Sequence, residues 1–129
     1  MRRFLLLLSL AAPLLGCGRS AAVPTAKYFS GETVDHWLET ARGPNAKARK
    51  KAADVLGNVG PIDPRAVAAL AVAAEDADAK VRDAAVLGLS KIGPPAVSAE
   101  AVLERASKDK DPTVRAHAAA ALKRVRGEP

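Results

Sequence analysis

The side chain best suited to covalent chemistry in this chain is the thiol of Cys17, its only cysteine. A thiolate is the best side-chain nucleophile available at neutral pH, so this residue is a natural acceptor for a covalent group. With no second cysteine, the chain cannot close an internal disulfide. Its stability must therefore come from packing alone.

A signal for export precedes Cys17. Arg2 and Arg3 follow the initiating methionine, and an apolar run extends from Phe4 to Leu15, broken only by Ser9 and Pro13. Twelve helical residues reach about 18 Å, whereas a bilayer core is about 30 Å thick. The run is thus too short to remain in a membrane, and residues 1–16 are expected to be a signal peptide that is removed.

The sequence Leu14-Leu15-Gly16-Cys17 resembles the lipobox of bacterial lipoproteins. The resemblance implies that a diacylglyceryl group is attached to Cys17 and that a signal peptidase cuts before it. Residues 17–30 are then the lipidated cysteine and a flexible spacer. We expect an exported protein that is anchored by lipid to either the cell membrane or the outer membrane. The sequence does not distinguish between the two.

An ordinary secretory signal is the alternative to the lipobox. In that case cleavage would occur at a small-residue site near Ala11 or Ala12, and Cys17 would have no role in processing or lipid attachment.

Other catalytic or metal-binding groups are scarce. His36 and His117 are the only histidines, and neither has a partner at metal-ligand spacing. The sequence therefore predicts no enzyme, no metal site, no cofactor and no small-molecule substrate. The formal net charge of +6 suggests an anionic polymer or nucleic acid as an alternative partner. Only 3% of the residues are aromatic, so few side chains could stack on the bases of a single-stranded nucleic acid. Nucleic acid is therefore not the expected ligand.

Composition favours helices. The 129 residues suffice for one domain, and 29 of them are alanine, the residue with the highest helix propensity. A β-sandwich of this length would need many more β-branched and aromatic residues to fill its inner faces.

The chain also repeats itself every 33 residues. The matching sets include Asn45, Asp78 and Asp111; Arg49, Arg82 and Arg115; Ala52, Ala85 and Ala118; and Leu56, Leu89 and Leu122. Within a unit the apolar positions are spaced by four and three, which places them on one face of a helix. A second helix precedes each of these, marked by Trp37, Leu70 and Leu103, where Trp37 is expected to fill the core of the first unit.

Capping residues divide the chain into helices. Asn45, Asp63, Asp78, Asp111 and Ser30 are expected N-caps. Gly60 and Gly93 follow the last periodic residues, where a left-handed C-cap is expected. The third unit departs from the pattern, because Ser98 is expected to start its first helix late and Arg126 replaces the final glycine.

The fold expected from these signals is all-α, an α-α solenoid of about three helical hairpins at residues 31–60, 64–93 and 97–126, within a domain at 31–129. The segments Asp78-Ala-Lys-Val-Arg82 and Asp111-Pro-Thr-Val-Arg115 resemble HEAT-like repeats of the PBS-lyase type. The resemblance implies a protein-interaction module or scaffold at the bacterial cell envelope, with a protein partner that the sequence does not identify. A bilin-lyase-like or other HEAT-type enzyme accessory is an alternative.

The recurring charges predict a structural ladder made of Asn45, Asp78, Asp111, Arg49, Arg82 and Arg115. Each aspartate caps its helix, and each arginine can reach a carboxylate in its own unit or the next. A row of arginines that binds anions is the alternative. Since Asn45 removes one negative charge, Arg49 is expected to be the least neutralised of the three arginines.

A partner-binding face is expected on the second helices, on the side that lines the concave surface in HEAT arrays. Its candidate residues are Lys50, Lys51, Asp54, Leu87, Lys91, His117 and Arg124. Leu87 is the best candidate for an apolar contact, because Asp54 and Ala120 occupy the equivalent positions.

Overall fold

The computed structural model describes residues 27–129. Within them the chain forms two short strands, six α-helices and one 3-10 helix. In chain order these are β1 (Tyr28–Phe29), β2 (Glu32–Thr33), α1 (Val34–Thr40), α2 (Ala46–Val59), α3 (Pro64–Ala73), α4 (Ala79–Ile92), η1 (Pro94–Ala99), α5 (Glu100–Ala106) and α6 (Pro112–Arg126).

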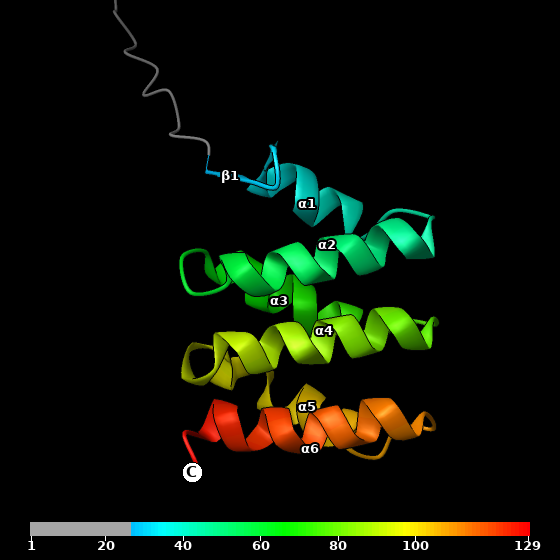
Figure 1. The fold of residues 1–129 in the computed structure, drawn as a ribbon, viewed down its shortest axis with the longest axis vertical. Helices are drawn as coiled ribbons and strands as arrows, with labels where there is room; N and C mark the ends of the chain where they lie inside the picture. The colour runs from blue at the N-terminus through cyan, green and yellow to red at the C-terminus, as the bar shows by residue number, and fades with distance from the viewer. Residues whose placement is uncertain (1–26) are drawn as a thin grey trace, which may run out of the picture.

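The helices lie in two layers (Figure 1). Helices α2, α4 and α6 lie one above another in the front layer, and all three run in the same direction. Helices α1, α3 and α5 lie behind them, and each packs on the second helix of its own hairpin. The predicted all-α solenoid of three helical hairpins is confirmed.

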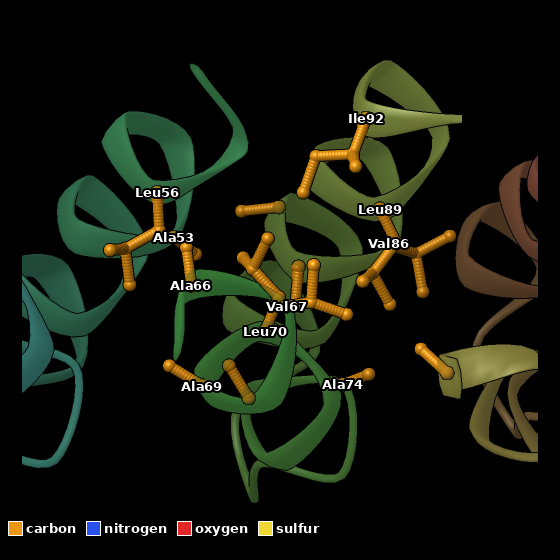
Figure 2. Packing of buried hydrophobic residues seen from close by; sticks show 14 of the residues in the cluster. Ala53, Leu56, Ala66, Val67, Ala69, Leu70, Ala74, Val86, Leu89 and Ile92 are labelled. Carbon is orange, nitrogen blue, oxygen red and sulfur yellow. The ribbon is translucent and has the colours of Figure 1, made fainter. Parts of the chain in front are cut away.

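The core lies between the two layers. Figure 2 shows Val67 and Leu70 of α3 pointing toward the space between α2 and α4, while Leu56 of α2 and Leu89 of α4 belong to the same buried cluster. Leu56, Leu70 and Leu89 are fully buried. Since neither helix of a hairpin could bury these side chains alone, the stacking of hairpins stabilises the whole fold.

Two glycines allow α2 and α4 to approach closely. A Cβ atom added to Gly57 would lie only 2.8 Å from the Cα of Gly88. Real Cβ atoms do not tolerate such contacts, so a larger residue at position 57 would force the two helices apart.

The predicted N-caps are confirmed at Asn45, Asp63, Asp78 and Asp111, because each side chain accepts a hydrogen bond from a backbone N–H two or three residues later. The prediction for Ser30 is wrong. Ser30 lies in a turn with φ of 53°, and Thr33 caps α1 by accepting a hydrogen bond from the N–H of His36.

The predicted left-handed C-caps differ from the structure. Gly60 is right-handed (φ −52°, ψ −38°), and its role is steric, because a Cβ there would overlap the side chain of Ile92. Gly93 has a positive φ of 71° but a ψ of −140°, outside the left-handed helical region. The left-handed cap occurs instead at Gly127, one residue after Arg126.

The first helix of the third unit is broken in two. Two consecutive prolines, Pro94 and Pro95, open the 3-10 helix η1, and Ala96 has non-helical angles (φ −91°, ψ 15°). Ser98 lies inside η1, and α5 begins at Glu100 without a side-chain cap. The expected start at Ser98 is therefore wrong.

A small hairpin covers the N-terminal end of the solenoid. Strand β1 pairs antiparallel with β2, and the buried Trp37 donates a hydrogen bond from Nε1 to the carbonyl of Phe29 (2.7 Å). Strand β1 thus lies ahead of residue 31, where the repeat domain is expected to begin. The expectation that Trp37 fills the core is confirmed.

Candidate functional site

Two arginines join consecutive units. Arg49 donates from Nε and Nη2 to the two carboxylate oxygens of Asp76, at 2.8 and 3.0 Å. Arg82 makes the same two bonds to Asp109, at 2.8 and 3.0 Å. Bidentate pairs of this kind are strong and fix the angle between the partners. Both ion pairs therefore fix the orientation of one hairpin relative to the next.

The remaining nitrogen of each arginine holds the loop before its own helix. Arg49 donates from Nη1 to the carbonyl of Gly43 (3.0 Å). Arg82 donates from Nη1 to the carbonyls of Asp76 (2.9 Å) and Ala77 (3.1 Å). Each guanidinium thus connects two loops at one edge of the layer.

The carboxylates of this ladder are not the cap residues. Asp78 and Asp111 accept hydrogen bonds from the backbone of α4 and α6, whereas the arginines bind Asp76 and Asp109. Asp76 and Asp109 are also 33 residues apart, two positions before the caps, and this spacing was the available signal. Glycine occupies the equivalent position 43 in the first unit.

The expectation that Arg49 is the least neutralised arginine is wrong, since it holds the carboxylate of Asp76. Arg115 is the one that forms no ion pair with any residue in the range 27–129.

The ion pairs affect the two carboxyl groups. The hydrogen bond from Arg49 lowers the pKa of Asp76 below its ordinary value. Burial raises the pKa of Asp109, but the hydrogen bonds from Arg82 and from the backbone of Asp111 outweigh it, so that this pKa is also lowered. Both groups are charged at neutral pH.

The outer surface of α2, α4 and α6 has a depression of about 340 Å³. Its lining includes four of the predicted binding residues, namely Asp54, Leu87, Lys91 and Arg124, together with Ala84, Gly88 and Ser90. Leu87 is 44% exposed there. The depression therefore has an apolar side chain among charged ones.

Two further depressions lie along the same surface near the N-terminal ends of the helices. Lys50 and Lys80 line both of them. One of the two also includes Lys47 and has a volume of about 490 Å³, and the other includes Asp83. Nδ1 of His117, another predicted binding residue, lies 2.6 Å from Oδ1 of Asp83.

Five of the predicted residues have partners inside the chain, His117 among them. Lys50 donates to Asp54 one helical turn away (2.8 Å), and Lys91 donates to Asn58 of the neighbouring helix (3.2 Å). Lys51 does not join the depressions, because its Nζ lies over the ring of Trp37, 5.4 Å from the centroid. The structure thus separates Lys51 from the rest of the predicted face.

Some predictions fall on residues outside the described range, namely the signal peptide at 1–16, the lipidation of Cys17 and most of the spacer. Among residues 27–129, no helix has the length and apolar character needed to cross a bilayer. The same residues contain no group of three or more histidine, cysteine, aspartate or glutamate side chains placed to hold a metal ion.

A family model for HEAT repeats matches residues 34–123 of the chain, from the start of α1 into the last turn of α6. Among curated proteins, the comparison found no match.

Proposed function

This chain belongs to the HEAT-repeat family, and from that premise we propose that it binds a protein partner through the outer surface of α2, α4 and α6 at the bacterial cell envelope. Stacked helical hairpins offer an extended surface of the kind that protein partners use. The proposal assigns the chain a binding role and no reaction.

The depression around Leu87 is the observation that carries this proposal. Protein interfaces commonly combine an apolar centre with a polar rim. Leu87 supplies the apolar centre, while Asp54, Lys91 and Arg124 supply a rim with both signs of charge. In the neighbouring units the equivalent positions are aspartate and alanine, so the feature is local to α4.

Site-specific photo-crosslinking would test the surface directly. A photoreactive residue at position 87 of the full chain should form a defined product with an envelope protein. Position 72 on α3 is the matched control, because Val72 is also apolar and is 70% exposed, but lies on the other layer. Loss of the product in a Lys91→Glu variant would support the assignment. Equal products at 87 and 72 would contradict it.

Attachment to the membrane is the second part of the proposal. The apolar run and Leu14-Leu15-Gly16-Cys17 support lipid attachment at Cys17. Two or three acyl chains would hold the domain permanently at the membrane surface, whereas one would not. Such an anchor would also raise its effective concentration near membrane-bound partners.

Mass spectrometry of the mature N-terminus tests the anchor. We expect the mature chain to begin at Cys17 with a diacylglyceryl mass on that residue, and a Cys17→Ala variant to lose it. A mature chain that begins near residue 12 without lipid would contradict the anchor and leave the binding surface as a separate question.

An anionic polymer is the second candidate ligand, favoured by the depression that Lys47, Lys50 and Lys80 share. Binding to duplex DNA or polyphosphate would then weaken steeply with salt, because each neutralised phosphate releases counterions. A Lys47→Gln, Lys80→Gln double variant should abolish such binding, whereas Leu87→Ala should leave it intact. Salt-insensitive binding would argue against this candidate.

A further inference from the structure

Arg115, in the last helical hairpin that the structure describes, has the same arrangement as the two arginines of the ladder. It donates from Nη1 to the carbonyls of Asp109 (2.7 Å) and Lys110 (3.0 Å). Arg82 donates from Nη1 to the carbonyls of Asp76 and Ala77 at corresponding positions of its own loop. The loop before α6 therefore holds the guanidinium of Arg115 in the pose that binds a carboxylate elsewhere in the molecule.

The other side of this guanidinium is open within the range 27–129. In Arg49 and Arg82, Nε and Nη2 bind the carboxylate of the following unit. For Arg115, the part of the chain that the structure describes offers these two nitrogens no hydrogen-bond acceptor. Two parallel N–H groups held in this way match the geometry of a carboxylate.

An apolar strip lies beside Arg115 on the same face of α6. Val86 and Leu89 of α4 are both fully buried beneath the next unit. The equivalent residues of α6, one period later, are Ala119, which is exposed, and Leu122, which is only partly buried. This end face of α6 therefore repeats an internal interface of the solenoid, and no hairpin among the described residues covers it.

We propose that this end face, formed by Arg115, Ala119 and Leu122, is a docking site for a helical segment of another protein that carries an aspartate or glutamate in the loop before its helix. The two internal interfaces show what such a face accepts. In both, the carboxylate stands two residues before the N-cap of the neighbouring helix, as Asp76 does before Asp78. The site lies at the end of the stack and is separate from the depression around Leu87.

A second copy of the chain does not fit this site head to tail. The first unit has Gly43 at the position where the other units have Asp76 and Asp109, so it offers no carboxylate to Arg115. Its end is also covered by the β1–β2 hairpin, which Trp37 holds through Phe29. The expected occupant is therefore a different protein with an acidic residue in the matching place.

An extended chain tests whether the end face accepts such a segment. Residues 126–129 are replaced by a second copy of residues 93–129, which continues the 33-residue period and presents a second Asp109 to Arg115. We expect the extended chain to gain helix in proportion to its added length. We also expect Arg115→Gln to raise its unfolding equilibrium constant at least tenfold, while the same change alters that of the natural chain less than threefold.

The matched control is Asp109→Asn in the added copy alone. If the carboxylate and Arg115 pair, the two changes together should cost no more than either one alone. Additive effects, or an added unit that does not fold onto α6, would overturn the proposal.

The natural occupant is tested with a photoreactive residue at position 119 of the full chain in its own envelope. The crosslinked peptide should come from a helical segment with an acidic residue just ahead of it, and Arg115→Gln should remove the product. Crosslinking to a second copy of the chain, to a segment without that acidic residue, or to nothing would overturn the proposal. A product at position 87 but not at 119 would leave the proposed function intact and remove only this site.

Discussion

The guanidinium of Arg82 binds both carboxylate oxygens of Asp109, 27 residues later in the chain. Only 7% of the Arg82 side chain and 11% of the Asp109 side chain are exposed, so that the pair is largely shielded from water. Arg49 and Asp76 repeat the arrangement one unit earlier. The stacking of the hairpins thus depends on charged contacts at one edge as well as on the apolar core between the layers.

Replacing Asp109 with asparagine should destabilise the domain by about 3 kcal/mol, because it leaves the buried guanidinium of Arg82 without a counter-charge. Urea denaturation followed by circular dichroism measures the change. Arg115→Gln, at the position equivalent to Arg82 in the last unit, is the control, and its effect should stay within about 0.5 kcal/mol, as for an exposed residue without an ion pair in the range 27–129. Equal losses in the two variants would contradict the structural role of the Arg82–Asp109 pair.

Stability should also fall in acid. The pKa values of Asp76 and Asp109 are lower in the folded chain than their ordinary values, so the unfolded chain takes up protons first as the pH decreases. The stabilisation is fully present above the unfolded pKa of about 3.9 and is lost as the pH falls through the lower folded values. Thermal melts between pH 7 and pH 2 measure this, and an Asp76→Asn, Asp109→Asn double variant should show a smaller acid-dependent loss. A wild-type chain whose melting temperature is unchanged down to pH 2 would contradict the assignment.

The periodic parts of the fold could be predicted from the sequence because they follow from repeated residue types. The helices, their aspartate caps and the burial of Leu56 and Leu89 all depend on short-range spacing. Asp76 and Asp109 have the same period, but they lie in loops just before the caps, where helix periodicity carries no information. Their role becomes visible only when the neighbouring unit is in place.

The irregular features could not be predicted, since each depends on tertiary contacts. Gly60 is the C-cap of α2 without the left-handed conformation, and a glycine fits there because Ile92 of the next unit leaves no room for a Cβ. The strands β1 and β2 have two residues each, too few for a recognisable alternating pattern. The depression around Leu87 includes four residues predicted for a binding face, but its lining also includes Ala84 and Gly88 of α4, which are buried and which a helix-by-helix pattern assigns to the core.

Gly57→Ala should destabilise the domain by about 1 to 3 kcal/mol, because the new Cβ would lie against the backbone of Gly88 and push α2 away from α4. Alanine would otherwise favour the helix by up to about 1 kcal/mol, so a net loss isolates the steric effect. Ser90→Ala tests the equivalent position one unit later and should change the unfolding free energy by less than about 0.5 kcal/mol. A stabilised Gly57→Ala variant would show that the two helices are not in close contact.

Hydrogen exchange should reveal that the end of the solenoid opens before its centre. Helix α4 packs against both α2 and α6, whereas α6 packs mainly against α4, α5 and η1 among the described residues. Since repeat proteins are stabilised by contacts between adjacent units, the third hairpin can open without disrupting the first two. The amide of Leu122 should therefore exchange at least tenfold faster than that of Leu89, its equivalent in the central unit. Equal rates at these two positions would mean that the three hairpins unfold together, and that the uncovered face of α6 costs the domain no local stability.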